Sequence, residues 1–313
     1  MPENYAIIAR DLHKVYTNQV AIAGVTLEVR AGEIFGLVGP DGAGKTTTMR
    51  ILAGILDPTS GSAEVAGFDI AKQPELVKSS IGYMPQRFAM YGDLTVTENM
   101  RFFAGIYKVT GDEFLIREKR LLEFSRLEPF RDRLASNLSG GMKQKLALAC
   151  TLIHTPQVLF LDEPTTGVDP VSRRDFWRIL YSLLKDGVTV FVSTPYMDEA
   201  ERCNRVALIS QGKITICDTP HALKGQMRGD LLEVLAHPIR VAHTALHDSP
   251  NVLGVQIFGD RLHVWVQNAT IGEQSMRAEL AATRVTITTI RQIVPSLEDV
   301  FISLANNGVE HGE

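Results

Sequence analysis

Short apolar runs alternate with helical patterns along the first two thirds of the chain. Residues 158–161 and 188–192 are β-branched runs without polar alternation, which is typical of parallel strands buried on both faces. Earlier strands, with polar breaks, are predicted at residues 5–12, 24–29 and 33–38. One helical pattern begins just after Gly44 and runs to about Ala53, and a polar, helix-prone stretch covers residues 96–130. This alternation predicts an α/β fold built on a βαβ sheet.

The pattern changes character after residues 219–230, a stretch of Pro, His, Lys and Gly that predicts a linker. A strand, a helix, two strands, a helix and a strand are then expected at residues 231–235, 239–247, 252–258, 262–266, 272–282 and 285–293. Gly259 and Asp260, between the two middle strands, are a hairpin signal. The order β-α-β-β-α-β predicts a small α+β ferredoxin-like domain at residues 226–313, after a larger domain at 1–225. A last helix is expected to open at Pro295 and Ser296.

Composition narrows the class of protein. Hydrophobic residues make up 45% and charged residues 22% of the 313 residues, as in an ordinary soluble protein. The net charge of -4 argues against a nucleic-acid-coating surface, so no nucleic-acid partner is expected. Cys150, Cys203 and Cys217 lack C-x-x-C spacing and are expected to be reduced structural thiols in a cytosolic protein. No signal peptide is expected, and no run approaches the roughly 20 apolar residues that span a bilayer.

A glycine-rich segment connects the strand at 33–38 to the helix after Gly44. It reads GPDGAGKTT and matches the P-loop pattern G-x-x-x-x-G-K-[ST]. Glycines let backbone N–H groups turn toward a phosphate, and the helix offers its positive N-terminal end to the same anion. Lys45 is expected to reach the β- and γ-phosphates of ATP, and the Thr46 hydroxyl to ligate magnesium. The ATP-binding residues are then Gly39, Pro40, Asp41, Gly42, Ala43, Gly44, Lys45, Thr46 and Thr47.

Two carboxylates follow the apolar run at 158–161, in the string VLFLDEP. Ligand sites in open α/β sheets lie at the carboxyl ends of strands. Asp162 is therefore expected to hold magnesium, directly or through water, as a Walker-B aspartate does. Glu163 is the better general base, because a second carboxylate there can orient and deprotonate the attacking water. The plainer alternatives are a glycine-rich turn for the P-loop and a helix-capping Asp-Glu-Pro turn for this pair.

The string LSGGMKQKL lies 23 residues before Asp162, counted from Ser139 (162 − 139). Together with the P-loop it resembles the ABC transporter ATPases, over about residues 5–217, and the string matches the ABC signature. Ser139, Gly140 and Gly141 open a helix whose N-terminus can face a phosphate, although a Ser-capped helix without such a role is the alternative. The resemblance implies that this helix completes the nucleotide site of a second ATPase subunit, with ATP sandwiched between the two.

The resemblance also implies roles for single residues. Tyr16 matches the aromatic that stacks on adenine, although a core or edge-strand tyrosine is the alternative. Gln86, in IGYMPQ, matches the glutamine that touches magnesium and the catalytic water and relays movement to the membrane subunit. Asp169, in GVDP, matches the aspartate that communicates across the dimer. Residues of about 90–150 would form the helical subdomain that docks on a membrane permease.

The sequence departs from the family pattern at two positions. Pro195, in STPYMDEAE, stands where the family carries a histidine that contacts the γ-phosphate. Proline has no imidazole and no backbone N–H, so it cannot replace that contact. Asp41 stands where the family usually has asparagine, and a carboxylate beside a triphosphate is unfavourable unless it is solvated or paired. Asp41 is therefore either a solvent-facing turn residue or a tuning residue.

The resemblance implies an ATP-hydrolysing subunit that uses magnesium and works with a separate integral membrane permease on the cytoplasmic face of the inner membrane. SRRDFW and the C-terminal PSLEDVFISL look like the drug- and antibiotic-exporter branch of bacterial ABC ATPases. Pro195 leaves two arrangements open: a homodimer with two slow sites, or a heterodimer with one impaired site. An idle nucleotide-binding half, or a non-transport ABC ATPase acting on ribosomes or DNA, is the alternative from another class. The C-terminal region would steady or regulate the dimer.

Overall fold

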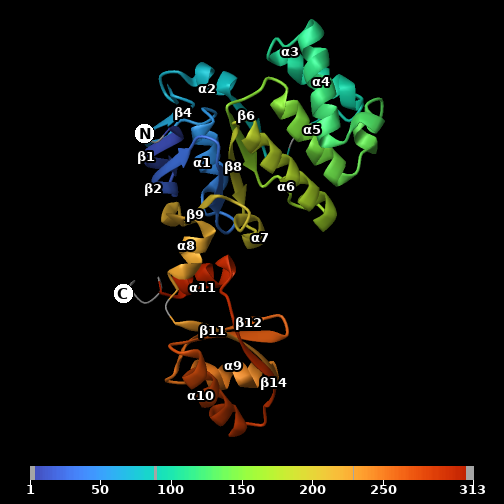
Figure 1. Cartoon of the computed structure of the whole chain (residues 1–313). Coiled ribbons are helices and arrows are strands. Elements are labelled where there is room, and N and C mark those ends of the chain that lie inside the picture. Colours follow the sequence, from blue (N-terminus) through green and yellow to red (C-terminus); the bar gives the residue numbers. More distant parts are fainter. Residues whose placement is uncertain (1–3, 88–89, 228, 308–313) are drawn as a thin grey trace. The chain divides into compact units, whose positions relative to one another are not determined.

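The computed structural model describes residues 4–87, 90–227 and 229–307. The chain divides into two compact units, Met1–Thr219 and Pro220–Glu313 (Figure 1). No helix among the described residues is both long enough and apolar enough to cross a membrane.

The first unit is built around a six-stranded sheet in the order β10-β9-β3-β8-β7-β6. Its strands are β3 (Ile34–Val38), β6 (Ile81–Met84), β7 (Val158–Asp162), β8 (Thr189–Thr194), β9 (Arg205–Ser210) and β10 (Lys213–Asp218). All neighbours are parallel except β10 and β9. Every residue of β3, β7 and β8 is buried, because helices and a second sheet leave no face of these strands to solvent. The predicted parallel βαβ sheet is confirmed.

A second, antiparallel sheet has the order β2-β1-β4-β5. It consists of β1 (Tyr5–Tyr16), β2 (Gln19–Arg30), β4 (Ser60–Val65) and β5 (Phe68–Asp69). Ile7 and Val25 of this sheet share one buried cluster with Met49 of α1 (Lys45–Leu52) and with Phe160 and Phe191 of the central sheet. The helix that follows β3 is therefore held by apolar packing between the two sheets, and its N-terminus stays at the carboxyl end of β3. Three more helices belong to this part: α2 (Pro74–Ser80), α6 (Pro170–Lys185) and α7 (Met197–Ala200).

A helical region with its own core is inserted between β6 and β7 (Figure 1). It contains α3 (Val96–Ile106), α4 (Gly111–Ser125) and α5 (Gly140–Leu152), with the 3-10 turns η1 (Glu128–Phe130) and η2 (Ala135–Asn137). Met100, Leu122 and Leu146 lie in one buried cluster that draws on all three helices. Thr95 and Glu98 form a capping box at the start of α3, which satisfies two of the N–H groups that a helix leaves unpaired.

The second unit has a four-stranded antiparallel sheet in the order β12-β13-β11-β14. Its elements are α8 (Pro220–Gly225), β11 (Asp230–His237), α9 (Ile239–His247), β12 (Val252–Phe258), β13 (Arg261–Val266), α10 (Ala269–Ala281), β14 (Thr286–Ile293) and α11 (Leu297–Asn307). From β11 to β14 this is the predicted ferredoxin-like order, and Phe258 pairs with Arg261 across the predicted turn. The structure differs from the linker expected at residues 219–230, because α8 lies within that stretch. The second unit begins at Pro220 rather than at residue 226.

The string PSLEDVF fixes the last helix to the sheet. Ser296 caps α11, because its hydroxyl oxygen accepts from the N–H of Asp299 at 3.3 Å. In return the N–H and the hydroxyl of Ser296 donate to the Asp299 carboxylate, at 2.7 and 2.6 Å. The other carboxylate oxygen lies 2.7 Å from Nδ1 of His263 on β13. Burial opposes ionisation of Asp299, yet these hydrogen bonds from His263 and Ser296 hold its pKa below its ordinary value. The motif therefore has a structural role within the second unit.

Candidate active site

The P-loop is a turn at the carboxyl end of β3 that leads into α1. Gly44 has φ 105° and immediately precedes the helix, a conformation that only glycine adopts readily. A Cβ on Gly39 would lie 2.2 Å from the carbonyl oxygen of Ile209 on β9. The backbone at Gly39 therefore passes too close to β9 for a side chain. Gly44 is favoured for a different reason, its positive φ.

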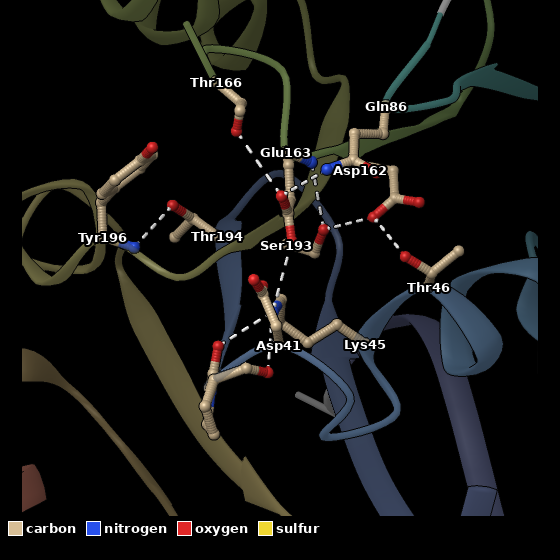
Figure 2. Close-up of polar contacts among 12 residues, drawn as sticks. Asp41, Lys45, Thr46, Gln86, Asp162, Glu163, Thr166, Ser193, Thr194 and Tyr196 are labelled. Atoms are coloured by element: carbon tan, nitrogen blue, oxygen red, sulfur yellow. Dashed lines mark hydrogen bonds and ion pairs between the residues drawn. The ribbon is translucent and has the colours of Figure 1, made fainter.

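Lys45 is a buried cation, with 4% of its surface exposed. Its Nζ donates to the carbonyl oxygens of Gly39 and Pro40, at 2.9 and 3.0 Å. It also lies 3.2 Å from Oε1 of Glu163, at the end of β7 (Figure 2). The carboxylate supplies the opposite charge that a buried ammonium needs. This ion pair brings the P-loop and the acidic pair to one place.

Asp162 is the second buried carboxylate of the site. Its Oδ1 accepts a hydrogen bond from the Thr46 hydroxyl at 3.1 Å and another from the Ser193 hydroxyl at 2.6 Å (Figure 2). Ser193 lies on β8 directly beside Asp162 in the parallel ladder. The Ser193 hydroxyl also accepts from the backbone N–H of Glu163 at 3.1 Å. Ser193 was not among the residues expected from the sequence; its signal is a serine near the carboxyl end of a buried strand.

Glu163 is held from three directions. Its backbone has φ 48°, a conformation rare for a residue with a side chain. Besides the contact of Oε1 with Lys45, its Oε2 accepts from Nε2 of Gln86 at 2.8 Å and from the Thr166 hydroxyl at 3.5 Å (Figure 2). Gln86 follows β6, so the ends of four neighbouring strands, β3, β8, β7 and β6, contribute to the site. The family resemblance implies contacts of Gln86 with magnesium and water, but nothing in the sequence indicates its bond to Glu163.

The two departures from the family pattern lie at the same end of the sheet. Asp41 extends into solvent, with 95% of its side chain exposed, and its Oδ1 is 3.9 Å from the Lys45 ammonium. Pro195 directly follows β8, and the next residue, Tyr196, donates its N–H to the Thr194 hydroxyl at 3.1 Å (Figure 2). A hydrogen bond from the backbone of Tyr196 to the side chain of Thr194 therefore closes the loop after β8.

The signature residues open α5. The Ser139 hydroxyl accepts from the N–H of Met142 at 3.3 Å, as an N-cap does. A Cβ on Gly141 would lie 2.4 Å from the Ser172 hydroxyl oxygen on α6, whereas a Cβ on Gly140 would meet nothing within 4 Å. Gly141 thus lets α5 approach α6, and Gly140 lies in open space.

The two remaining predicted residues lie outside the polar cluster around Lys45. Asp169 caps α6 by accepting from the N–H groups of Ser172 and Val171, at 2.9 and 3.1 Å. These bonds, that from Ser172 above all, lower the pKa of Asp169. Tyr16, at the end of β1, is 42% exposed, and the Lys14 ammonium lies 5.4 Å from its ring centroid. Its ring is therefore accessible at the surface.

A P-loop lysine, a hydroxyl-bonded aspartate and an adjacent glutamate at the carboxyl ends of parallel strands define a P-loop nucleotide triphosphatase. The ABC transporter family model matches residues 22–166. The chain is 35% identical to the daunorubicin resistance ATP-binding protein DrrA2 of Streptomyces coeruleorubidus, over 99% of this chain and 98% of that protein. It belongs to the ABC transporter ATP-binding proteins.

Two further comparisons agree with this family. The chain is 51% identical over 67% of its length to the "Probable multidrug ABC transporter ATP-binding protein YbhF" of Escherichia coli (strain K12), and it spans 36% of that longer protein. A solved dimeric ATP-binding cassette in a post-hydrolysis state, bound to ADP and Pi, superposes with a TM-score of 0.63 at 25% identity, over 68% of this chain and 98% of the cassette. ATP and ADP are therefore the nucleotides of this family.

Alanine substitutions at the two signature glycines test whether α5 packs closely against α6 at Gly141 but not at Gly140. Gly141→Ala should destabilise the chain by about 1–3 kcal/mol, because its Cβ would overlap Ser172. Gly140→Ala should change the stability by less than about 1 kcal/mol, because alanine favours a helix and no atom is near. Urea unfolding of both variants provides the measurement. Equal destabilisation by the two substitutions would contradict the close packing of α5 against α6 at Gly141.

Proposed function

We propose that this ABC ATPase powers the export of drugs or other hydrophobic compounds through a separate membrane permease, at the cytoplasmic face of the inner membrane. The full-length similarity to a daunorubicin resistance protein supports this substrate class. The dimeric state of the similar cassette supports a second ATPase subunit as partner. Among its described residues, the second unit contains no group of three or more His, Cys, Asp or Glu placed to hold a metal. We assign this unit an accessory, regulatory role.

The observation that carries the proposal is the contact of the Lys45 ammonium with Glu163 beside the Thr46–Asp162 pair. Lys45 would bind the β- and γ-phosphates, because it is a buried cation at the N-terminus of α1. The P-loop residues 39–47, except Pro40, would supply backbone N–H groups to the same phosphates. Tyr16 would stack on the adenine ring, since an exposed aromatic can offer its face.

The donor atoms around Asp162 suit magnesium. The Asp162 carboxylate, the Thr46 hydroxyl and the Gln86 amide are oxygen ligands of the kind that this hard cation prefers. Asp162 and Thr46 already lie within hydrogen-bond distance, at 3.1 Å. We assign Thr46, Gln86 and Asp162 to hold the ion, which would neutralise charge on the phosphate oxygens. The Ser193 hydroxyl fixes the orientation of the Asp162 carboxylate.

Glu163 is assigned as the general base. Its carboxylate can take a proton from water that attacks the γ-phosphate, and the hydrogen bond from Gln86 sets the direction in which it points. Gln86 would sense the same water and relay movement to the permease. Ser139, Gly140 and Gly141 would complete the site of the second subunit, since the N-terminus of α5 can face a phosphate. Asp169 would communicate across the dimer.

A second candidate function rests on Pro195. Because proline offers no side-chain donor and no N–H, the γ-phosphate would lack one contact at this site. The chain would then be the hydrolysis-impaired half of a heterodimer, with the competent site supplied largely by its partner. Under the main proposal, the chain instead forms a homodimer with two slow sites, and Glu163 acts as the base in each.

Glu163→Gln tests the proposed hydrolytic role. Removing the base should lower ATP turnover by roughly a hundredfold or more, while ATP binding remains, because Lys45 and the P-loop are unchanged. Phosphate release by the purified chain, with magnesium, measures the effect. Glu75→Gln is the matched control, since its side chain is 83% exposed and pairs with Lys78 on α2. Hydrolysis by Glu163→Gln at the parent rate would overturn the assignment.

Pro195→His tests the effect of the missing histidine. A single preorganised contact to a developing anion is typically worth roughly a hundredfold in rate, so turnover of the isolated chain should rise by about that factor. Pro195→Ala, the control, removes the proline ring without adding an imidazole and should leave turnover near the parent value. If Pro195→His also leaves turnover unchanged, the absent histidine does not limit this enzyme.

A further inference from the structure

A buried carboxylate near the active site has no part in the proposed chemistry. Glu199, on α7, is fully buried. One of its oxygens accepts a hydrogen bond from the Thr165 hydroxyl, and the other accepts from the Thr194 hydroxyl, at 2.7 Å for Thr194. A buried charge is costly unless it is paired and hydrogen-bonded. Apolar packing would stabilise a core at lower cost, so the position of this carboxylate needs another explanation.

Arg173 supplies the opposite charge. It lies on α6, one turn after Asp169, and its Nε is 3.6 Å from Oε1 of Glu199. Its Nη1 is 3.5 Å from Asp198, and its guanidinium carbon lies 4.7 Å from the centroid of the Tyr196 ring. The guanidinium therefore forms an ion pair with the buried carboxylate, at a distance longer than a hydrogen bond, and lies over the aromatic ring of the loop that follows β8.

The groups that meet at Glu199 come from segments that flank the reacting side chains. Thr165 is two residues after Glu163, and Thr166, beside it, donates to the Glu163 carboxylate. Thr194 precedes Pro195 and follows Ser193, which binds Asp162. Glu199 thus joins the segment that carries the general base to the loop in which histidine is replaced.

We propose that Glu199, held by Arg173, is a positioning residue for ATP hydrolysis. It fixes the backbone of residues 163–166 against the end of β8, and so keeps the Glu163 carboxylate in place without touching the nucleotide. In this chain Pro195 donates no hydrogen bond, so the loop depends on Thr194, Tyr196 and Arg173 for its shape. The inference rests on the proposed role of Glu163 as base.

Thr165→Val tests the inference with little change of volume. It removes the hydroxyl that donates to Glu199, whereas Thr165→Ser keeps it. We expect Thr165→Val to lower kcat by roughly ten- to a hundredfold, since small misplacements of reacting groups cost this much. KM for ATP and the affinity for ATP should stay within about twofold, because the P-loop contacts are unaltered. Thr165→Ser, which keeps the hydroxyl, should have the kcat of the parent chain.

Glu199→Gln provides a second variant of equal size, in which one carboxylate oxygen becomes an NH₂ group that cannot accept. It should lower kcat in the same way, with KM unchanged, at a temperature where thermal melting shows all variants folded. In a Glu163→Gln background, Thr165→Val should have no further effect, because both act through the same group. Parent-like kcat in folded Thr165→Val and Glu199→Gln would overturn the positioning role.

The outcomes separate the two proposals. If Glu163→Gln loses turnover but Thr165→Val does not, only the positioning role of Glu199 fails. If Glu163→Gln itself retains parent turnover, the assignment of Glu163 as the base is wrong, and the positioning role that rests on it fails for that reason. If Thr165→Val raises KM together with the fall in kcat, Glu199 supports nucleotide binding rather than the position of the base, and the inference is overturned.

Discussion

The buried ammonium group of Lys45 organises the carboxyl edge of the six-stranded sheet in the first unit. Lys45 lies beneath the surface at the start of α1, and its charge is met by two carbonyl oxygens of the P-loop and by the carboxylate of Glu163. An unpaired ammonium at this depth would be strongly unfavourable. The pairing therefore constrains where β7 ends relative to β3, and it places Glu163 at the P-loop.

The parallel sheet makes that constraint achievable. β8 lies between β3 and β7, so the ends of three strands meet at one edge, and the register sets Asp162 beside Ser193. Small polar side chains then connect the strand ends: Ser193 binds Asp162, and Thr194 binds the buried Glu199. Rigid, fully buried strands deliver these groups, which is why loops alone do not have to fix the site.

Much of the site could be predicted, because its groups lie in local strings that couple a strand to a turn and a helix. The P-loop and the Asp162–Glu163 pair are of this kind. The hairpin at Gly259, in the second unit, could be predicted because it too is a local string. Glu199, Ser193 and the bond from Gln86 to Glu163 could not be predicted, since each depends on strand register between segments distant in sequence. β4, with the sequence SGSAEV, was missed because its apolar pattern is too weak to indicate a strand. The linker prediction was inaccurate, since Pro220 begins α8 rather than extending a loop.

We infer that the Lys45 ammonium belongs to a nucleotide site and is not merely a structural cation. Calorimetric titration of the full chain with ATP and magnesium, for the parent and for Lys45→Met, tests it most directly. Methionine keeps an unbranched stem at this buried position and removes the charge. We predict that Lys45→Met remains folded but binds ATP at least about tenfold more weakly, since charge-assisted hydrogen bonds are each worth about 1.5–3 kcal/mol. A folded Lys45→Met that binds ATP with parent affinity would contradict this claim.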